Sequence, residues 1–526
     1  MAHPSRGWAH AERRRYALLP SPSTRTRAAI SPLRVDHHQT NRLLRVCRRH
    51  MAHRTRQHPH AAAYRCALRR RATPLPLRPR TNLAHSEQTV KAEPATPDPT
   101  GPIFISYRHS DGIDLAAELA GLLRAAGIPV WRDKDDLPPG DTEHRLTQAI
   151  SAGISGAVIV TTADIANSTV VKFLEAPLLL QIHDDYPEFA LAVANAIENE
   201  HGSLDYTAPD KLLGVKPGTL AGVDQHRVDR AELLHIVDRL LRQRVANHRA
   251  HVADTHLFEL SVQTRNAPQS FDRTLGQLDI RLRPAGHGRL PSAAGLSDLR
   301  DTIGLLPDAV TQSAAERVRI RGGAHLCVAF ALGASLPSSR IGHMEVFDQQ
   351  GSAWSSAGEA RFTSPPHIYV ERQAINSGVA APGRRAVGVY LDLLAQRSDA
   401  AFDQYLEAND QDLTAWQHMR SSGGDLLDPS LAGATAADAA AHIRALANDH
   451  ANADVHLLLR CPFPIAMLMG RLTNTLRVVA YEWDDSDDGI DADGRPCYVP
   501  ALRVRASAAT GVIEEVLLRD TRDDRS

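Results

Sequence analysis

The sequence of 526 residues predicts an α/β protein in which a parallel-sheet domain precedes a larger domain of two fused α/β halves. Three observations support this prediction. Short apolar strands alternate with helices from about residue 103, two later segments recur at one common offset, and the first 90 residues lack a sustained apolar period. We therefore divide the chain into an extension, a first domain, and a second domain with two halves, over 1–101, 102–250, and 251–526 (about 251–380 and 381–520).

The extension is strongly basic. Its first 90 residues contain 19 Arg, no Lys and three acidic residues, a formal charge of +16, so with a net charge of -1 overall the remainder carries -17. A segment rich in Arg, His and Pro cannot bury enough apolar surface to fold, which predicts disorder. Three alternatives stay open: an organelle transit peptide, a nucleic-acid contact through Arg13–Arg15, and a later translation start with Val90 as the alternative.

Composition excludes several classes of function. An acidic body is a poor match for long nucleic acid, although small anionic ligands in local basic pockets stay open. The five cysteines show no CxxC pair and no Cys/His spacing of the zinc type, which indicates a reducing cytoplasm and no metal. The uncharged runs 146–163 and 322–339 contain polar residues, so we predict no membrane span.

The first domain begins with regular alternation. Its expected strands cover 103–107, 128–131, 155–162 and 188–195, and its expected helices cover 114–127, 142–152 and a segment near Ser168. Such alternation predicts a parallel sheet covered on both faces, with ligands outside the carboxyl ends of the strands. No GxGxxG motif follows a strand here, so a dinucleotide would not bind in the Rossmann manner.

Three motifs in this stretch resemble the opening of a TIR domain. They are FISYRHSD at 104–111, VWRD at 130–133 and LPPGD at 137–141, and the resemblance covers about residues 102–247. It implies a flavodoxin-like parallel sheet. Many TIR domains only assemble, whereas others cleave the bond between nicotinamide and ribose in NAD+ with one glutamate on the helix after the third strand.

In this sequence that glutamate is Glu175, within NSTVVKFLEAPLL, with Ser168 as the expected N-cap two turns earlier. Departure of nicotinamide leaves an oxocarbenium-like ribose, and one carboxylate can stabilise that charge without a metal. The resemblance therefore implies that Glu175 is catalytic. An ordinary solvated helix acid is the alternative, and Pro177 is expected to disturb the helix just after it.

The resemblance also implies a set of substrate-binding residues. Arg108 would meet a phosphate and Tyr107 would stack on a base, while Trp131 begins the long loop that closes the cleft and mediates self-assembly in this family. The candidates for NAD+ binding are Tyr107, Arg108, Trp131, Asp133 and Asp136. NAD+ would be the substrate, so no cofactor is expected. Arg108 as a surface charge and Trp131 as a core residue stay open.

The second domain contains an internal repeat. HLFELSVQT at 256–264 aligns with VGVYLDLLA at 387–395, and AHLCVAFALG at 324–333 aligns with VHLLLRCPFP at 455–464, both at an offset of 131 residues. Because two segments share one offset, we infer two fused Rossmann-like halves. Such a pair places the carboxyl ends of both sheets along a shared groove, where loop amides and helix N-termini favour anions.

This layout resembles a SAVED domain, a tandem of CARF-like halves that senses cyclic oligonucleotides made during phage infection. The segment 456–474, the strand with Tyr481 and Trp483, and YVPALRV at 498–504 carry most of the likeness. The candidate ligand residues lie near strand ends and are Arg265, Arg397, Arg460 and Arg471. Each suits bidentate contact with a phosphate. His325 and His456 recur at equivalent strand starts, which we interpret as architectural.

A sensor behind an effector predicts a mechanism. The second domain would bind a cyclic oligonucleotide, with cyclic tri-adenylate as one candidate, and protomers would then assemble, as a filament if the contact does not close. The TIR domains would cleave NAD+ to nicotinamide and ADP-ribose, or to a cyclic product, in antiphage defence. The alternative is a non-catalytic TIR scaffold assembled by a nucleotide sensor.

Overall fold

The structure is a computed structural model of the whole chain, and its description covers ten stretches. They are 96–132, 142–265, 276–285, 289–357, 366–376, 385–409, 411–422, 427–485, 496–508 and 511–519. Residue contacts divide the chain into Met1–Gln88 and Thr89–Ser526, and all of the described residues belong to the second unit. The predictions for the extension fall outside the described residues and stay predictions.

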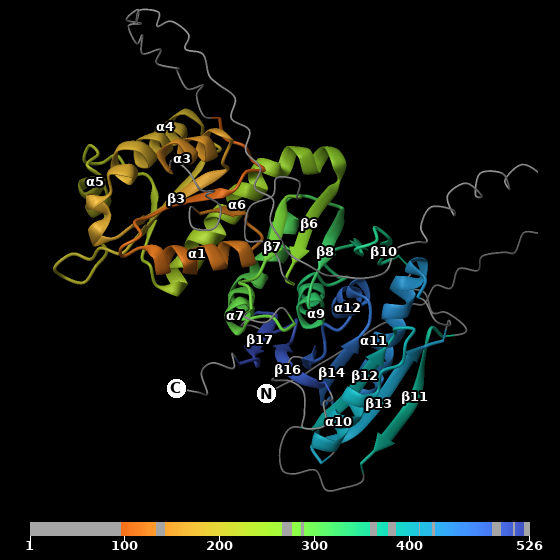
Figure 1. The fold of residues 1–526 in the computed structure, drawn as a ribbon. Coiled ribbons are helices and arrows are strands. Elements are labelled where there is room, and N and C mark those ends of the chain that lie inside the picture. Colours follow the sequence, from red (N-terminus) through yellow and green to blue (C-terminus); the bar gives the residue numbers. More distant parts are fainter. Residues whose placement is uncertain are drawn as a thin grey trace, which may run out of the picture. The chain divides into compact units, whose positions relative to one another are not determined.

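The first sheet is parallel and has five strands (Figure 1). Its strands are β1 (Ile103–Ser106), β2 (Val130–Trp131), β3 (Gly156–Thr161), β4 (Ala190–Asn195) and β5 (Asp224–His226), in the order β2-β1-β3-β4-β5. The predicted α/β class is confirmed. β5 was not predicted, because its three residues, Asp-Gln-His, carry no apolar run.

Helices cover both faces of this sheet. Alternate strand residues such as Ile105 and Val158 pack against α1 (Ile113–Ala125) and α6 (Arg230–Thr255). The strand residues between them pack against α3 (Thr142–Ser151) and α4 (Ala176–Asp185), as a parallel sheet requires. The short helices η1 and α5 complete this part of the chain, over Ala163–Asn167 and Ala208–Leu213.

Helix α6 is longer than the sequence indicated. Asp229 caps its N-terminus by accepting a hydrogen bond from Glu232 N at 3.2 Å. The amphipathic pattern of the sequence predicts a helix only over about 229–245, but the helix continues through the polar residues near His251 and ends at Thr255. His256 then adopts the left-handed conformation with φ 54°, so the chain turns directly into the next strand.

The second sheet is mixed and has the order β10-β9-β8-β6-β7. Four strands, β6 (Leu257–Gln263), β7 (Leu278–Arg281), β8 (Arg317–Gly323) and β9 (His343–Phe347), are parallel, and β10 (Ala353–Ser355) is antiparallel. Its helices are α7, η3, α8 and α9, over Ala293–Thr302, Ile303–Leu305, Leu306–Gln312 and Leu326–Ser335.

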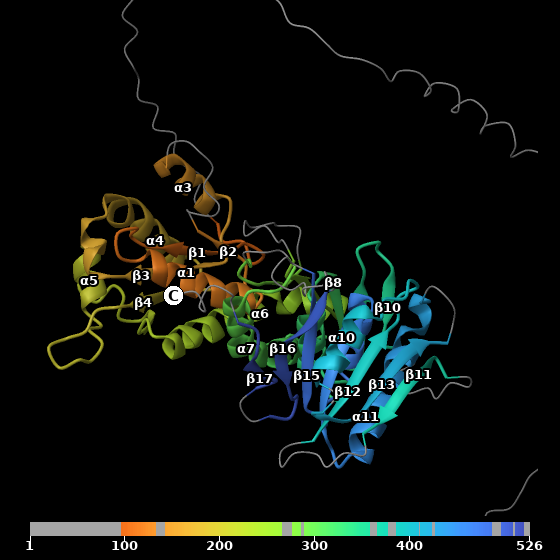
Figure 2. The ribbon, with the colours of Figure 1, turned by 60° about the horizontal axis from the view of Figure 1, so that its bottom comes forward.

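The last sheet has seven strands in the order β11-β13-β12-β14-β15-β16-β17 (Figure 2). The central strands β13, β12, β14 and β15 are parallel and cover Leu413–Ser421, Ala386–Asp392, Asp454–Arg460 and Val478–Asp484. The antiparallel strands are β11 (Ile368–Ile375), β16 (Cys497–Val504) and β17 (Ile513–Val516). The helices are α10, η4, α11 and α12, over Ala400–Asn409, Pro429–Leu431, Ala432–Asp449 and Phe463–Gly470.

The topology confirms the duplication but corrects half of the predicted alignment. The order β9-β8-β6-β7 repeats as β15-β14-β12-β13, so β6 corresponds to β12, as expected. The second aligned pair was wrong, because 324–333 enters helix α9 whereas 455–464 contains strand β14. Residues 327–335 are buried on every side, and a helix that is apolar all round shows no 3.6-residue period. The true counterparts are β8 with β14 and α9 with α12.

The two halves meet through α9 and α12, which lie side by side (Figure 1). A Cβ on Gly333 would lie 2.0 Å from Met467 O, and a Cβ on Gly470 would lie 2.1 Å from Phe330 O. These reciprocal contacts need glycine, because any side chain would push the helices apart.

Among the helices of the described stretches, none has the length and apolar content to cross a membrane.

The first domain and the first half of the second domain share one apolar core. Leu119 and Leu122 of α1 belong to the same buried cluster as Phe258 and Leu278. Gly127, at φ +85°, follows α1, and its carbonyl accepts a hydrogen bond from Asp279 N of β7 at 2.8 Å.

Arg244, in the middle of α6, closes this junction from within. Its guanidinium is 2% exposed and donates to Gly101 O at 2.8 Å, Thr100 O at 3.2 Å and Gln277 O at 2.7 Å. It also reaches Ser155 Oγ at 3.4 Å. Burial lowers the pKa of Arg244 to about 10. One side chain therefore holds the chain before β1 and the chain before β7 to the same helix.

We expect Arg244→Met to lower the free energy of unfolding by about 3 kcal/mol, because the carbonyls of Gly101 and Gln277 would lose their donor in buried hydrogen bonds and that of Thr100 in a part-buried one. Denaturant unfolding of the full chain measures this loss. Arg249→Met, at an exposed position of the same helix, is the matched control. Equal stability of the two variants would contradict the role assigned to Arg244.

Candidate active site and sensor site

Glu175 lies at the carboxyl edge of the first sheet. It is 6% exposed, and its Oε2 accepts a hydrogen bond from Ser106 Oγ at 2.5 Å. Ser106 is the last residue of β1, next to β3 in the sheet. Ligands of a parallel sheet are expected at this edge, so the buried Glu175 carboxylate lies where a ligand would bind.

The backbone around Glu175 differs from the regular helix that was predicted. Glu175 ends a five-residue π-helix, η2 (Val171–Glu175), and α4 starts at the next residue with Pro177 in its first turn. In a regular helix the Pro177 ring would collide with the carbonyl four residues earlier, and the wider π-turn avoids this. Ser168 Oγ accepts from Val171 N at 3.3 Å, consistent with its expected capping role.

Arg108 is tied into the loop between β1 and α1. Its Nε donates to Ser110 Oγ at 2.8 Å and pairs with Asp164 Oδ2 at 3.3 Å. Hydrogen bonds from Ser110 and Asn167, together with the Arg108 charge, hold the pKa of Asp164 below its ordinary value. A phosphate that binds Arg108 must therefore compete with Asp164.

The other expected NAD+ contacts have mixed positions. Tyr107 is buried and stacks on His109, with ring centroids 5.2 Å apart. Trp131 is half-buried and stacks on Phe104 with ring centroids 5.0 Å apart, and its role in NAD+ binding stays a prediction. Asp133 and Asp136 lie outside the described residues. Phe173, which the sequence interpretation did not assign to the site, is 76% exposed two residues before Glu175.

A groove of about 1290 Å³ lies elsewhere in this domain. It includes Ala190 and Asp224, the first residues of β4 and β5, together with Arg239 of α6. The groove therefore opens near the amino ends of the strands, and neither Glu175 nor Ser106 lines it. Chemistry favours the carboxyl edge as the active site, because the buried carboxylate is there.

In the second half of the second domain, the structure brings two of the predicted arginines, Arg397 and Arg460, to one edge of the sheet. Arg460, at the end of β14, donates to Asp392 at 2.6 Å, and Arg420 donates to the other oxygen of Asp392 at 2.5 Å. Arg397, 63% exposed, pairs with Glu371 at 2.7 Å. Asp392 ends β12, so these charges gather at the carboxyl ends of the parallel strands.

In the first sensor half, Arg265 follows β6 and donates to Glu482 at 3.2 Å. The Glu482 carboxylate also accepts from Cys327 N at 3.0 Å, at the N-terminus of α9, and its burial raises its pKa. Glu482, a residue of the second half, thus places its carboxylate between Arg265 and the N-terminus of α9 in the first half, where an anion is favoured. Sequence reasoning missed Glu482, because its spacing from Arg265 is not local.

Arg471 does not join the other three arginines. Its side chain is 1% exposed, and it donates to Ile341 O at 2.7 Å, which ties the end of α12 to the chain before β9. We leave it out of the proposed ligand site, because a surface ligand has no access to a side chain buried to this degree.

The two histidines are architectural but not equivalent, which corrects the predicted symmetry. His325 precedes α9, and its backbone N donates to Thr264 Oγ1 at 2.9 Å. His456 lies within β14, where its Nδ1 is 2.8 Å from Tyr405 Oη and 3.1 Å from Tyr481 Oη. Burial lowers the pKa of His325 to about 3 and that of His456 to about 4.

Asp392, Asp399 and His418 form a group close enough to surround a metal ion. Arg372 Nε donates to His418 Nδ1 at 3.4 Å, so the proton of a neutral imidazole lies on Nε2, the atom that faces Asp399. Asp392 is already held by two arginines. This arrangement disfavours a cation.

The comparisons with known proteins agree with this architecture. Residues 103–195 match the family model of the TIR domain, and residues 302–504 match that of the SMODS-associated and fused to various effectors sensor domain, SAVED. The fold is thus that of an α/β effector joined to a duplicated α/β sensor. The chain is a TIR domain fused to a SAVED sensor domain.

One curated relative is the NAD(+) hydrolase PdTIR of Paracoccus denitrificans (strain Pd 1222), 31% identical over 119 residues. The match spans 22% of this chain and 39% of that protein. Among solved structures, the Acinetobacter baumannii Cap4 SAVED/CARF-domain containing receptor with 2'3'3'-cAAA aligns with a TM-score of 0.36 and 12% identity, over 69% of this chain and 84% of that one. The Moraxella osloensis Cap4 receptor gives 0.33 and 12%, over 68% and 83%.

The buried His456 predicts acid sensitivity of the sensor. Its folded pKa of about 4 lies below the ordinary value of 6.5, so the unfolded chain binds the proton first and stability falls as the pH drops from 6.5 toward 4. We expect His456→Gln to remove about 2 kcal/mol of the loss between pH 7 and pH 5, measured by denaturant unfolding at each pH. A pH slope identical to that of the wild type would refute this contribution.

Proposed function

We propose that this chain is an NAD+ glycohydrolase that a cyclic oligonucleotide activates, acting in the cytoplasm in antiphage defence. The observation that carries the proposal is the Glu175 carboxylate, buried at the carboxyl edge of the sheet and held by Ser106. The TIR match and the likeness to an NAD(+) hydrolase over this part of the chain support the same chemistry.

In this reaction the bond between ribose C1' and the nicotinamide nitrogen breaks, and its electron pair leaves with neutral nicotinamide. Positive charge then develops on the ribose, and the Glu175 carboxylate stabilises it. Water adds at C1' and releases one proton, which gives ADP-ribose, while attack by the adenine would give a cyclic product. Ser106 is a positioning residue, because its hydroxyl donates to one oxygen of the Glu175 carboxylate and fixes the orientation of that group.

The sensor half of the proposal depends on three arginines at the two carboxyl edges. Arg265 pairs with Glu482, Arg397 with Glu371, and Arg460 with Asp392. Phosphates of a cyclic oligonucleotide would exchange with these carboxylates, and guanidinium groups bind both kinds of oxygen in the same planar geometry. Ligand binding would then assemble protomers, into a filament if the contact is head to tail.

We expect Glu175→Gln to reduce nicotinamide release by roughly a thousandfold, because the substitution keeps the size of the side chain but removes its charge. The assay follows nicotinamide by chromatography with NAD+ and a panel of cyclic di-, tri- and tetranucleotides, including 3'3'3'-cAAA. Asp184→Asn, an exposed acid on α4, is the matched control. If ligand binds and assembles the wild type without nicotinamide release, the protein is a scaffold and the catalytic proposal fails.

We expect Arg397→Gln to weaken binding of the activating nucleotide by roughly tenfold, because one charge-assisted contact to a phosphate is lost. Calorimetric titration measures the affinity. Arg321→Gln is the control, because Arg321 is 57% exposed, close to the 63% of Arg397, yet pairs with Glu259 of β6 and not with Glu371, Asp392 or Glu482. Equal affinities of both variants and the wild type would remove Arg397 from the site.

A further inference from the structure

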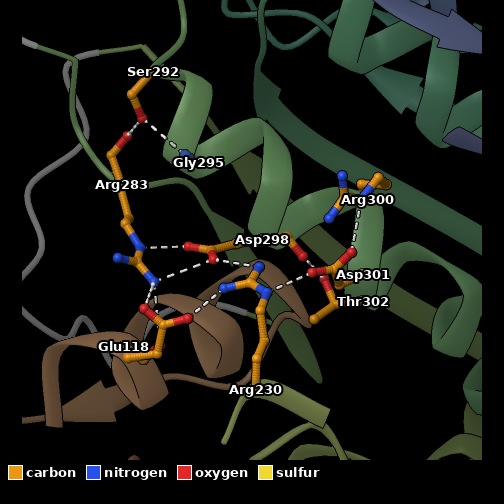
Figure 3. A network of polar contacts seen from close by, with 9 residues as sticks. All are labelled: Glu118, Arg230, Arg283, Ser292, Gly295, Asp298, Arg300, Asp301 and Thr302. Carbon is orange, nitrogen blue, oxygen red and sulfur yellow. Dashed lines mark hydrogen bonds and ion pairs between the residues drawn. The ribbon is translucent and has the colours of Figure 1, made fainter. Parts of the chain in front are cut away.

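A cluster of charged side chains joins the TIR part of the chain to the sensor (Figure 3). This α1–α7 charge cluster consists of Glu118, Arg230, Arg283, Asp298 and Asp301. Arg230 donates to Glu118, to Asp298 at 3.0 Å and to Asp301 at 2.6 Å. Arg283 donates to Asp298 at 2.5 Å and to Glu118 at 3.3 Å. Each arginine therefore bridges the TIR helix α1 and the sensor helix α7.

The cluster is arranged to keep these contacts together. Asp298 is 2% exposed, and a carboxylate buried to this degree is stable only while its partners stay in place. Burial alone would raise the pKa of Glu118, but hydrogen bonds and charges from Arg230 and Arg283 hold it below its ordinary value. If α7 shifts relative to α1, both arginines must consequently move as well to keep their contacts with the two helices.

Gly121 shows how closely α1 sits on the cluster. A Cβ at this position would lie 2.3 Å from Arg283 Nε and 2.6 Å from Asp298 Oδ2. Even the smallest side chain would push the Arg283 guanidinium out of its contacts with Asp298 and Glu118. The charged groups of the cluster therefore lie directly against the backbone of α1 at this point.

The two ends of this connection lie in the loops next to α1 and α7. On the TIR side, α1 directly follows Asp111, which accepts from Thr162 Oγ1 at 2.8 Å and from Asp164 N at 2.9 Å, in the loops beside Ser106. On the sensor side, Arg283 O accepts from Ser292 Oγ, the N-cap of α7. Arg289, three residues before Ser292, pairs with Asp485 of the second half.

We propose that the α1–α7 charge cluster is the coupling element that carries ligand occupancy of the sensor to the NAD+ site of the same protomer. In this role α1 moves with α7 and adjusts the loop between β1 and α1. The proposal rests on the proposed function for its biological meaning, but the mechanical coupling itself is testable without ligand or substrate.

Three variants of the full chain test the coupling. Glu118→Gln removes one charge of the cluster, whereas Gly121→Ala keeps every charge and displaces Arg283. Asp114→Asn, one turn earlier on α1 and exposed, is the control. Hydrogen exchange followed by mass spectrometry reports on 104–112, which covers the end of β1 and the loop before α1, on 278–285 of the sensor, and on β4 as an internal reference.

We expect Glu118→Gln and Gly121→Ala to speed exchange roughly tenfold in both 104–112 and 278–285, with β4 unchanged. Alanine is the better helix former, so without a constraint at this point Gly121→Ala would slow exchange in α1 instead. Faster exchange on only one side of the cluster, or equal effects of Asp114→Asn, would overturn the proposal.

Activity then distinguishes the coupling from the proposed function. With the activating nucleotide at saturation, both cluster variants should bind and assemble like the wild type but release nicotinamide roughly tenfold more slowly per assembled chain. Unchanged turnover per assembled chain would overturn the coupling. If the wild type releases no nicotinamide with any member of the nucleotide panel, the catalytic proposal fails, and the exchange experiment still decides the coupling.

Discussion

The buried guanidinium of Arg244 is the contact on which the arrangement of the two parts depends. A charge inside a protein is tolerated only where acceptors surround it, and these acceptors are backbone carbonyls on both sides of the junction. Because the carbonyls belong to the chain entering β1 and the chain entering β7, the two sheets take their places from one helix. This arrangement requires a long, unbroken α6, because a flexible connection would not hold the Arg244 side chain in place between the three carbonyls.

The candidate active site depends on a local departure from regular structure within this frame. Ser106, the last residue of β1, and Glu175, the last residue of the π-turn, meet at the carboxyl edge of the sheet. Pro177 disfavours a regular helical turn at this point. The helical hydrogen bonds are therefore weaker around Glu175, whose carboxylate points inward. Irregular backbone beside a buried charge is typical of functional sites, which often trade local stability for chemistry.

The sequence was most informative where one element carries its own signal. The apolar strands β1, β3 and β4 and the amphipathic helix α1 were predictable from local periodicity, and Glu175 followed from the TIR motifs. Helix α9 was misread because a fully buried helix has no polar face. Ser106 and Glu482 could not be paired with Glu175 and Arg265 in advance, because those contacts join residues 69 and 217 positions apart.

The two sensor halves share a topology but not an electrostatic environment, and this asymmetry has a consequence for ligand binding. At the first edge, Glu482 of the second half satisfies both Arg265 and the N-terminus of α9. At the second edge, Asp392 is held within its own half by Arg420 and Arg460. A phosphate that takes Arg265 would therefore release a contact between the halves, whereas one that takes Arg460 would not. Since Arg289 and Asp485 join the halves near the same strand, ligand binding at the first edge is the event better suited to move α7.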